Sequence, residues 1–279
     1  MLSRRKLLAL ASAAAFARTH AVKLGVTDWN LRLTGKVEAL GFAKRIGFAG
    51  VQISLGRNPV NDRLPLSDRK VQLDYMSESQ KLGFPIVSTC LDILHVNYLK
   101  NDKLGRKWVR EGIEATSALG VDVMLLPFFG KGAIEAQDEQ DAVADFLAEA
   151  GPIAEKAKVI LGLENTISAE ANARILNRAA SKSVKVFYDT GNSAAKGFDV
   201  YREIRWLTAK RICQIHLKDN PHYLGDGDID FGKVLKSIAD ADYKQWAVFE
   251  TDSPSRTVEA DMKRNLTYVQ QLLAKSPKA

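Results

Sequence analysis

Eight short apolar runs recur along the chain, and each is followed by a longer amphipathic stretch. Because the runs are rich in β-branched residues and are bounded by polar or glycine-containing segments, we interpret them as β-strands. The expected strands cover residues 22–26, 50–53, 85–90, 121–126, 159–163, 184–188, 212–216 and 246–249. Regular alternation of strands and helices is typical of a parallel sheet, so this pattern restricts the fold to the α/β class.

The amphipathic stretches between these runs are the expected helices. One of them has apolar residues at the spacing of a helix that lies on a sheet, namely Val143, Phe146, Leu147, Ala150 and Ile153. The expected helices cover residues 36–46, 68–82, 103–119, 138–157, 169–180, 200–207, 231–239 and 255–274. Several are followed by a glycine suited to the C-terminal cap position: Gly47, Gly83 and Gly120.

Eight strand and helix pairs joined by short connections predict a single closed (β/α)8 TIM barrel over residues 22–279. A chain of 279 residues suits one such barrel, and no linker or low-complexity segment divides it. The alternative is an open, doubly wound sheet. We regard it as the weaker interpretation because no glycine-rich fingerprint follows the first strand.

A carboxylate or an imidazole stands at the end of each of the last four strands: Glu164, Asp189, His216 and Glu250. In a closed parallel barrel the carboxyl ends of all strands meet at one rim, where catalytic groups lie. Three carboxylates and one imidazole brought together there are suited to bind one divalent metal ion. A single member could instead cap a helix or be a buried polar group, but the shared position of all four favours a metal site.

Glu164 and Glu250 are also predicted to be the catalytic residues. A divalent ion can polarise a carbonyl and its neighbouring hydroxyl, which acidifies the proton on the carbon between them. A carboxylate that the metal does not fully neutralise can then remove or return that proton. The two glutamates lie three strands apart, so we expect them to flank a substrate and to act on its opposite faces.

Residues 1–21 have the layout of a signal peptide for export. Arg4 and Arg5 precede a short apolar run, and two small-x-small cleavage sites end at Ala17 and Ala21. The arginine pair favours the twin-arginine route and a periplasmic or otherwise exported location. The apolar run has about ten residues, against about 20 needed to span a bilayer, so we expect no stable membrane span.

The charge distribution and the two cysteines bear on the partners that the protein binds and on whether it contains a disulfide. The formal net charge is +7, and lysine and arginine are interspersed with aspartate and glutamate. This distribution does not predict a nucleic-acid partner. Cys90 and Cys213 fall in the third and seventh strands, far apart around a barrel, so we expect free buried thiols, although an exported protein could form a disulfide. A homo-oligomer is compatible with the sequence, which does not specify the oligomeric state.

The segments around the last four strand ends resemble the xylose isomerase-like TIM barrels, the superfamily of sugar phosphate isomerases and epimerases. The similarity extends over roughly residues 22–273 and is densest from Leu163 to Thr251. The segments that carry it are Leu-Glu-Asn at 163–165, Tyr-Asp-Thr-Gly-Asn at 188–192, Gln-Ile-His-Leu-Lys-Asp at 214–219, Leu-Gly-Asp-Gly-Asp-Ile-Asp-Phe at 224–231 and Val-Phe-Glu-Thr at 248–251.

This resemblance implies that Glu164, Asp189, His216 and Glu250 bind one divalent ion, with Mn²⁺ expected first and Co²⁺, Mg²⁺ or Zn²⁺ as alternatives. It also implies that the two glutamates form the acid/base pair of the ketose 3-epimerases. The chain departs from the 3-epimerases of free ketoses, which have a histidine at the position of Asn192 and an arginine shortly after the seventh-strand histidine. The resemblance therefore indicates the family but does not specify the substrate.

Seven further residues are candidates for substrate binding because they lie at strand ends or next to the expected ligands: Trp29, Gln52, His95, Lys131, Asn165, Asn192 and Lys218. Phe128 and Phe129 precede Lys131, so this segment offers an aromatic wall and a cation to a sugar. Each candidate could equally be a loop residue without substrate contact.

We therefore expect a metal-dependent sugar isomerase or epimerase that acts by proton transfer next to a carbonyl. Two alternatives remain open. One is a lyase or hydrolase that cleaves keto-glycosides by β-elimination from the same enolate, and the other is a sugar-binding module without catalysis. The presence of both Glu164 and Glu250 argues against the binding module. Barrel endonucleases that act on abasic DNA need several clustered histidines, and only His95, His216 and His222 follow residue 21.

Overall fold

The computed structural model describes residues 22–275 and has the closed barrel that the sequence predicts. Eight parallel strands pair in chain order, and the first also pairs with the last, which excludes the open sheet. The strands are β1 (Lys23–Thr27), β2 (Gly50–Ser54), β3 (Ile86–Cys90), β4 (Val123–Pro127), β5 (Ile160–Glu164), β6 (Val184–Asp189), β7 (Ile212–Leu217) and β8 (Trp246–Phe249). The expected signal peptide at residues 1–21 lies outside the described residues.

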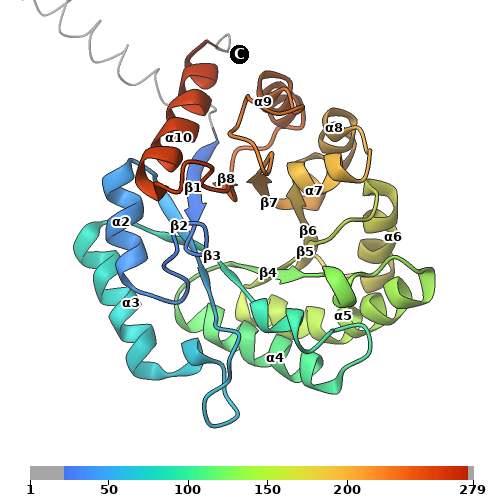
Figure 1. The fold of residues 1–279 in the computed structure, drawn as a ribbon. Helices are drawn as coiled ribbons and strands as arrows, with labels where there is room; N and C mark the ends of the chain where they lie inside the picture. Colours follow the sequence, from blue (N-terminus) through green and yellow to red (C-terminus); the bar gives the residue numbers. More distant parts are fainter. Residues whose placement is uncertain (1–21, 276–279) are drawn as a thin grey trace, which may run out of the picture.

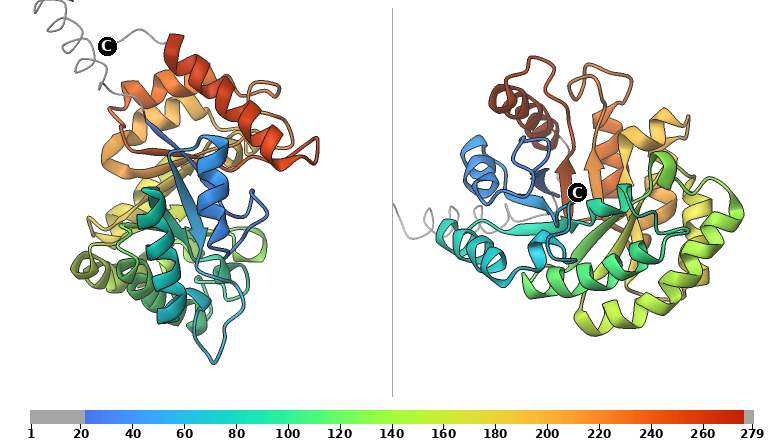
Figure 2. Two further views of the ribbon diagram at one scale, coloured as in Figure 1. Left: turned by 90° about the vertical axis from the view of Figure 1, so that its left-hand side faces the viewer. Right: turned by 60° about the horizontal axis from the view of Figure 1, so that its bottom comes forward.

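Helices form an outer ring around the strands (Figure 1 and Figure 2). They are α2 (Glu38–Ile46), α3 (Arg69–Leu82), α4 (Lys103–Ala118), α5 (Gln137–Ala157), α6 (Ala169–Ala179), α8 (Val200–Arg211), α9 (Phe231–Asp240) and α10 (Val258–Lys275). The short helix α7 (Thr190–Ala195) contacts both β7 and α8. Short 3-10 helices are η1 (Pro65–Ser67), η2 (Asp92–His95) and η3 (Gly130–Gly132). Helix α10 lies beside α2, so the helical ring closes where the strands close.

The predicted and observed boundaries differ by a few residues, and the differences have local causes. Strand β4 begins at Val123 rather than at residue 121, because the backbone N–H of Val121 bonds to the carbonyl of Thr116 at 3.1 Å in the turn that ends α4. Gly120 has a positive φ of 71° within this turn and follows the C-cap residue Leu119. The sequence does not predict α7, which is only six residues long.

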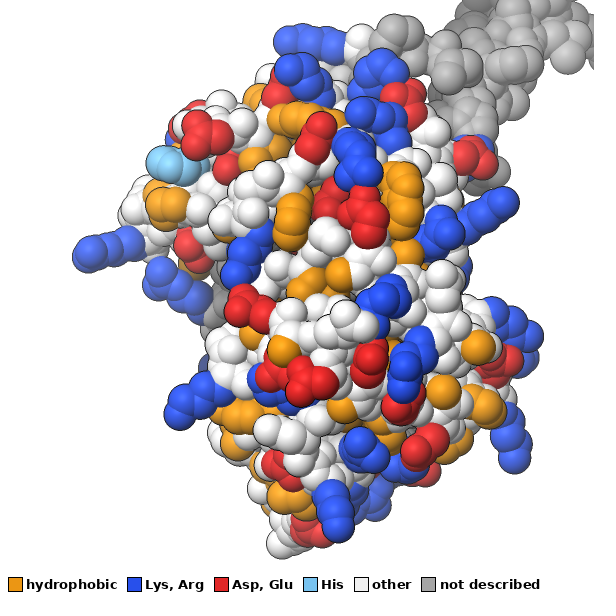
Figure 3. Space-filling model, turned by 90° about the vertical axis from the view of Figure 1, so that its right-hand side faces the viewer, with side chains coloured by type: hydrophobic (Ala, Val, Ile, Leu, Met, Phe, Trp, Pro, Cys, Tyr) orange, Lys and Arg blue, Asp and Glu red, His pale blue; other side chains and the backbone are white. Residues whose placement is uncertain are grey.

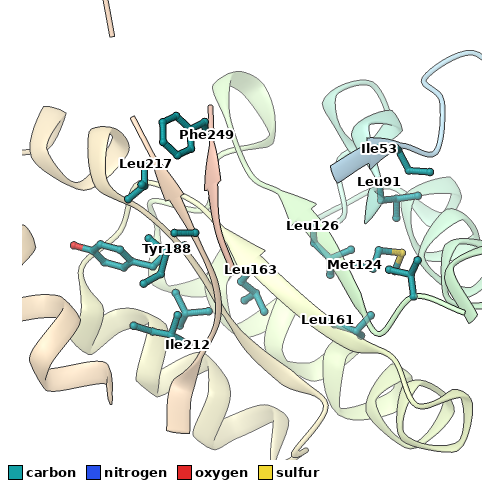
Figure 4. Packing of buried hydrophobic residues seen from close by; sticks show 14 of the residues in the cluster. Ile53, Leu91, Met124, Leu126, Leu161, Leu163, Tyr188, Ile212, Leu217 and Phe249 are labelled. Carbon is teal, nitrogen blue, oxygen red and sulfur yellow. The ribbon is translucent and has the colours of Figure 1, made fainter. Parts of the chain in front are cut away.

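Most of the hydrophobic core lies between the strands and the helices. Along β4, Met124 and Leu126 face this layer, whereas Val123 and Leu125 belong to a separate cluster inside the barrel. Figure 4 shows Met124 and Leu126 together with Leu161 of the next strand. This division follows from the alternation of side chains along a strand.

Besides this apolar cluster, the barrel interior contains small and polar side chains. Ser88 Oγ on β3 donates a hydrogen bond to Gln214 Oε1 on β7 at 2.8 Å, which joins opposite walls of the barrel. A Cβ at Gly162 would lie 2.8 Å from Cys213 Sγ, so this close approach requires glycine. Cys90 and Cys213 are both buried free thiols, as predicted.

The surface carries interspersed charges of both signs. Figure 3 shows lysine and arginine side chains next to aspartate and glutamate on the face that it presents. Ion pairs such as Arg178–Asp145, with Nε and Oδ1 2.5 Å apart, join neighbouring helices. Among the described residues, no helix has the length and apolar character needed to cross a membrane.

Candidate metal centre and active site

The four predicted metal ligands lie together at the carboxyl ends of β5 to β8. Glu164 and Asp189 end their strands, His216 is the next-to-last residue of β7, and Glu250 directly follows β8. Each residue offers a ligand atom, and the four atoms all lie within 4.8 Å of one another. Barrel closure brings them together, because parallel strands end at the same rim.

His216 is fully buried and contacts all three carboxylates. Its Nδ1 lies 2.9 Å from Glu164 Oε1, 3.6 Å from Asp189 Oδ2 and 3.6 Å from Glu250 Oε2. Its Nε2 lies 2.7 Å from the amide oxygen of Gln52 on β2. An amide oxygen only accepts hydrogen bonds, so this contact assigns the proton of a neutral imidazole to Nε2. In that neutral form the Nδ1 lone pair would face three carboxylates, and a cation at that point would satisfy all four groups.

Asp189 gives a second reason to place a cation here. Its Oδ1 accepts a hydrogen bond from the backbone N–H of Asn192 at 2.6 Å, but its buried Oδ2 has no hydrogen-bond partner. A buried carboxylate oxygen without a partner is unfavourable unless it binds a cation. Lys218 Nζ lies 3.8 Å from this oxygen, which is beyond hydrogen-bond distance. The four side chains therefore fit a divalent metal ion.

Burial and proximity shift the pKa values of these ligands. Burial raises the pKa of Glu164 to about 7, although the charge of His216 opposes this shift. Burial also acts on Asp189, but the charges of Lys218 and His216 outweigh it and hold the pKa of Asp189 below its usual range. Burial tends to lower the pKa of His216, but Glu164 and Glu250 raise it to about 10. The raised pKa of His216 reflects the negative charge of the carboxylates around it, which favours a bound cation, whereas the raised pKa of Glu164 reflects mainly its burial.

The two glutamates are held by different partners. Glu250 accepts hydrogen bonds on both oxygens, from Trp29 Nε1 at 3.0 Å and from Lys218 Nζ at 2.7 Å. Glu164 Oε1 accepts a hydrogen bond from Asn192 Nδ2 at 3.3 Å. Burial tends to lower the pKa of Lys218, but Asp189 and Glu250 raise it above its ordinary value, so Lys218 stays charged. These contacts fix the orientation of both carboxylates.

A cavity of about 780 Å³ opens at this cluster. Glu164 and Glu250 line it, as do four of the residues predicted to bind substrate: Trp29, His95, Asn192 and Lys218. The position of the cavity at the carboxyl ends of the strands, and its volume, are typical of a small-molecule active site.

Three other residues predicted to bind substrate do not line the cavity. Gln52 is buried against His216 and orients its ring. Asn165 lies in the loop after β5 and faces α6, where its Nδ2 donates a hydrogen bond to Asn172 Oδ1 at 2.8 Å. Lys131 is exposed on η3, outside the cavity.

Loops after β2 and β3 complete the cavity with residues that the sequence does not identify. They include Arg57 and Asp92. Asp92 Oδ1 accepts a hydrogen bond from Ser54 Oγ at 3.0 Å, and Arg57 Nε lies 3.9 Å from Asp92 Oδ2. The position of Asp92, two residues after β3, is a signal that could have identified it. Arg57 lies in an irregular loop, where no spacing rule applies.

Asp28 is a buried carboxylate directly after β1 that the sequence also does not identify. Its Oδ2 accepts hydrogen bonds from the backbone N–H groups of Gly35 at 2.9 Å and Ser54 at 3.1 Å, so it joins two loops of the rim. Its Oδ1 is buried without a hydrogen-bond partner. Burial raises the pKa of Asp28 to about 7, and the charge of Asp92 adds to this shift.

We expect Asp28 to make the free energy of unfolding depend on pH. Its folded-state pKa of about 7 exceeds the ordinary value of 3.8, so the folded state retains a proton that the unfolded state has released. Stability should therefore fall as pH rises from about 4 to about 7, by at most about 4 kcal/mol. Asp28→Asn keeps an acceptor oxygen without the charge and should lack this contribution. Denaturant unfolding of both proteins across this pH range measures it, and parallel pH profiles would contradict the prediction.

The closed (β/α)8 barrel, with a cavity at its carboxyl rim, has the architecture of a barrel enzyme. The carboxylates and the histidine clustered beside the cavity could hold a metal ion. The chain belongs to the xylose isomerase-like TIM barrel family, whose model matches residues 40–272. This match includes all four ligand positions and confirms the family resemblance seen in the sequence.

Three proteins are similar to this chain in sequence or in structure. A 2-epi-5-epi-valiolone 7-phosphate 2-epimerase from Actinoplanes sp. is 23% identical over 204 residues, which are 71% of this chain and 73% of the relative. The structure of 3-keto-D-glucoside 4-epimerase from E. coli superposes with a TM-score of 0.70 at 15% identity and covers 90% of this chain and 100% of its own. The structure of D-psicose 3-epimerase from Clostridium cellulolyticum superposes with a TM-score of 0.75 at 14% identity. The match covers 90% of this chain and 99% of the epimerase. At these identities the structural matches show the fold alone.

Proposed function

We propose that the protein is a metal-dependent sugar isomerase or epimerase that transfers a proton at a carbon next to a carbonyl group. The observation that carries this proposal is that Glu164 and Glu250 both belong to the cluster of possible metal ligands and also line the cavity. A carboxylate so placed can reach a substrate carbon whose neighbouring oxygens lie at the metal centre. The names of the three similar proteins support this class, since each describes an epimerase.

The four clustered side chains would hold the ion, and a divalent ion bound there supplies Lewis-acid polarisation of the substrate carbonyl. Carboxylate ligands suit Mn²⁺ or Mg²⁺, and the imidazole also allows Co²⁺ or Zn²⁺. We propose Mn²⁺ as the physiological ion and the others as alternatives.

In the proposed reaction one glutamate removes the proton and the other returns a proton to the opposite face of the carbon. Trp29 and Lys218 hold the carboxylate of Glu250, and Asn192 holds that of Glu164. Lys218 also places a positive charge in the cavity wall, where it stabilises negative charge that develops on a substrate oxygen.

Isotope exchange tests this proposal. The manganese-loaded protein is incubated in deuterated water with a panel of ketoses and 3-keto-glycosides, and the products are analysed by NMR and mass spectrometry. We expect deuterium at a carbon next to the carbonyl, together with the epimer or isomer. Release of a free sugar would identify the lyase or hydrolase instead, and sugar binding without any exchange would identify a binding module.

We also propose that the chain is exported by the twin-arginine route. The support comes from the sequence of residues 1–21, where Arg4 and Arg5 precede an apolar run and two cleavage sites. A metalloprotein suits this route because it crosses the membrane folded and can be loaded with its ion beforehand.

Replacing both Arg4 and Arg5 with lysine should therefore leave an unprocessed precursor in the cytoplasm. Immunoblotting of fractionated cells from a host with this pathway measures the distribution. Arg18→Lys, a conservative change in the same segment but outside the pair, is the control and should be processed normally. Normal processing of the double variant would show that the twin-arginine route is not used.

A further inference from the structure

We propose that the cavity contains a second sugar subsite, so that the substrate is a glycoside or oligosaccharide rather than a free monosaccharide. The subsite is formed by residues that follow β2, β3 and β4, opposite the ligands on β5 to β8. We call it the loop side and define it as Arg57, Asn58, Asp92, His95 and Phe129. The inference rests on the proposed function, because it names the substrate class of the same site.

The cavity is larger than one sugar ring requires. Its volume is about 780 Å³. Cavities that hold drug-sized ligands measure about 300 to 1,000 Å³, so this one has room for a ligand larger than a hexose, which has about twelve heavy atoms. A monosaccharide bound at the ligand cluster would therefore leave part of the cavity for a second group.

An aromatic wall on the loop side fits a second sugar ring. The rings of His95 and Phe129 are stacked, with centroids 6.1 Å apart and planes inclined by 23°. Both side chains are only partly buried, and both line the cavity. The apolar C–H face of a sugar ring can pack on such a surface, as ligands commonly do on the aromatic side chains of a pocket.

Polar groups on the loop side match the hydroxyls of such a ring. Asp92 is held by Ser54 Oγ at 3.0 Å, and its other oxygen lies 3.9 Å from Arg57 Nε. This arrangement presents a carboxylate acceptor and guanidinium donors beside the aromatic wall, and Asn58 adds an amide. Because Asp92 offsets the charge of Arg57, the loop side favours a neutral polyhydroxylated ring over a phosphate or carboxylate.

The loop side can be changed without disturbing the metal centre. Within residues 22–275, no hydrogen bond or ion pair joins the five loop-side residues to Glu164, Asp189, His216 or Glu250. Truncation of His95 or Phe129 therefore tests binding on the loop side while leaving the four clustered side chains in place.

Calorimetric titration of the manganese-loaded protein tests the subsite. The probes are glucose, glucose 6-phosphate and the disaccharides cellobiose, maltose and trehalose. We expect at least one disaccharide to bind about tenfold or more tightly than glucose, and His95→Ala and Phe129→Ala each to reduce this advantage about tenfold. Affinity for glucose and metal content should stay unchanged. His222→Ala replaces an exposed histidine outside the cavity and should behave like the wild type.

Two results would overturn the subsite. One is equal affinity for glucose and every disaccharide. The other is tightest binding of glucose 6-phosphate with loss of that preference in Arg57→Ala, which would assign the loop side to an anion. Isotope exchange distinguishes this failure from failure of the proposed function. Exchange into ketoses without any preference for glycosides would contradict only the subsite. A preference for a disaccharide without exchange on any substrate would contradict only the proposed reaction.

Discussion

Replacing Glu164 or Glu250 with glutamine is expected to lower turnover by about 10²-fold or more, the scale for loss of a general base. Glutamine keeps nearly the same volume and an oxygen that can bind a metal, but it has no carboxylate to take up a proton. Each variant should therefore retain substantial metal while losing activity. Turnover and metal content, measured on the same preparation, separate the role in proton transfer from the role in metal binding.

The double variant provides a further measurement. If the two carboxylates act on opposite faces of one substrate carbon, either loss blocks the full cycle, and the combined loss should be far from additive. Isotope exchange that survives in one single variant only would identify the glutamate that removes the proton first. Glu114→Gln, an exposed position on α4, is the matched control and should keep wild-type turnover. Metal-replete glutamine variants with near wild-type turnover would leave both residues as ligands only.

Replacing His216 with alanine is expected to lower metal affinity by more than about 100-fold, because loss of a residue that merely supports a ligand already costs about 10 to 100-fold. His216 provides the nitrogen of the cluster and lies within 3.6 Å of oxygens from all three carboxylates. Mass spectrometry of the dialysed protein measures the metal, and far-ultraviolet circular dichroism should stay close to the wild type. Chelation of the wild-type metal should likewise abolish turnover, and added Mn²⁺ should restore it.

Two further variants sharpen this result. Gln52→Ala removes the partner of His216 Nε2 and should weaken metal binding less than His216→Ala does, since the ligand itself remains. His222→Ala removes an exposed histidine outside the cluster and should retain full metal content. Undiminished metal in His216→Ala would remove this residue from the centre and contradict the assignment of all four ligands.

The sequence alone determines the barrel and the positions of the clustered side chains. Eight alternating strand and helix patterns leave few possible architectures, and Glu164, Asp189, His216 and Glu250 stand at corresponding points of four consecutive strands. In a closed parallel barrel, residues at the carboxyl ends of the strands all lie at the same rim. Residues far apart in sequence can therefore be placed together without knowledge of any loop.

Only the tertiary structure decides which neighbouring side chains face the cavity. Asn165 and Asn192 both follow a ligand closely in sequence, yet Asn165 faces α6 whereas Asn192 contacts Glu164. The hydrogen bond from Trp29 to Glu250 joins residues 221 positions apart. Arg57 reaches the cavity from an irregular loop. Side-chain direction in loops depends on backbone conformation and on contacts across the barrel, and neither leaves a periodic pattern in the sequence.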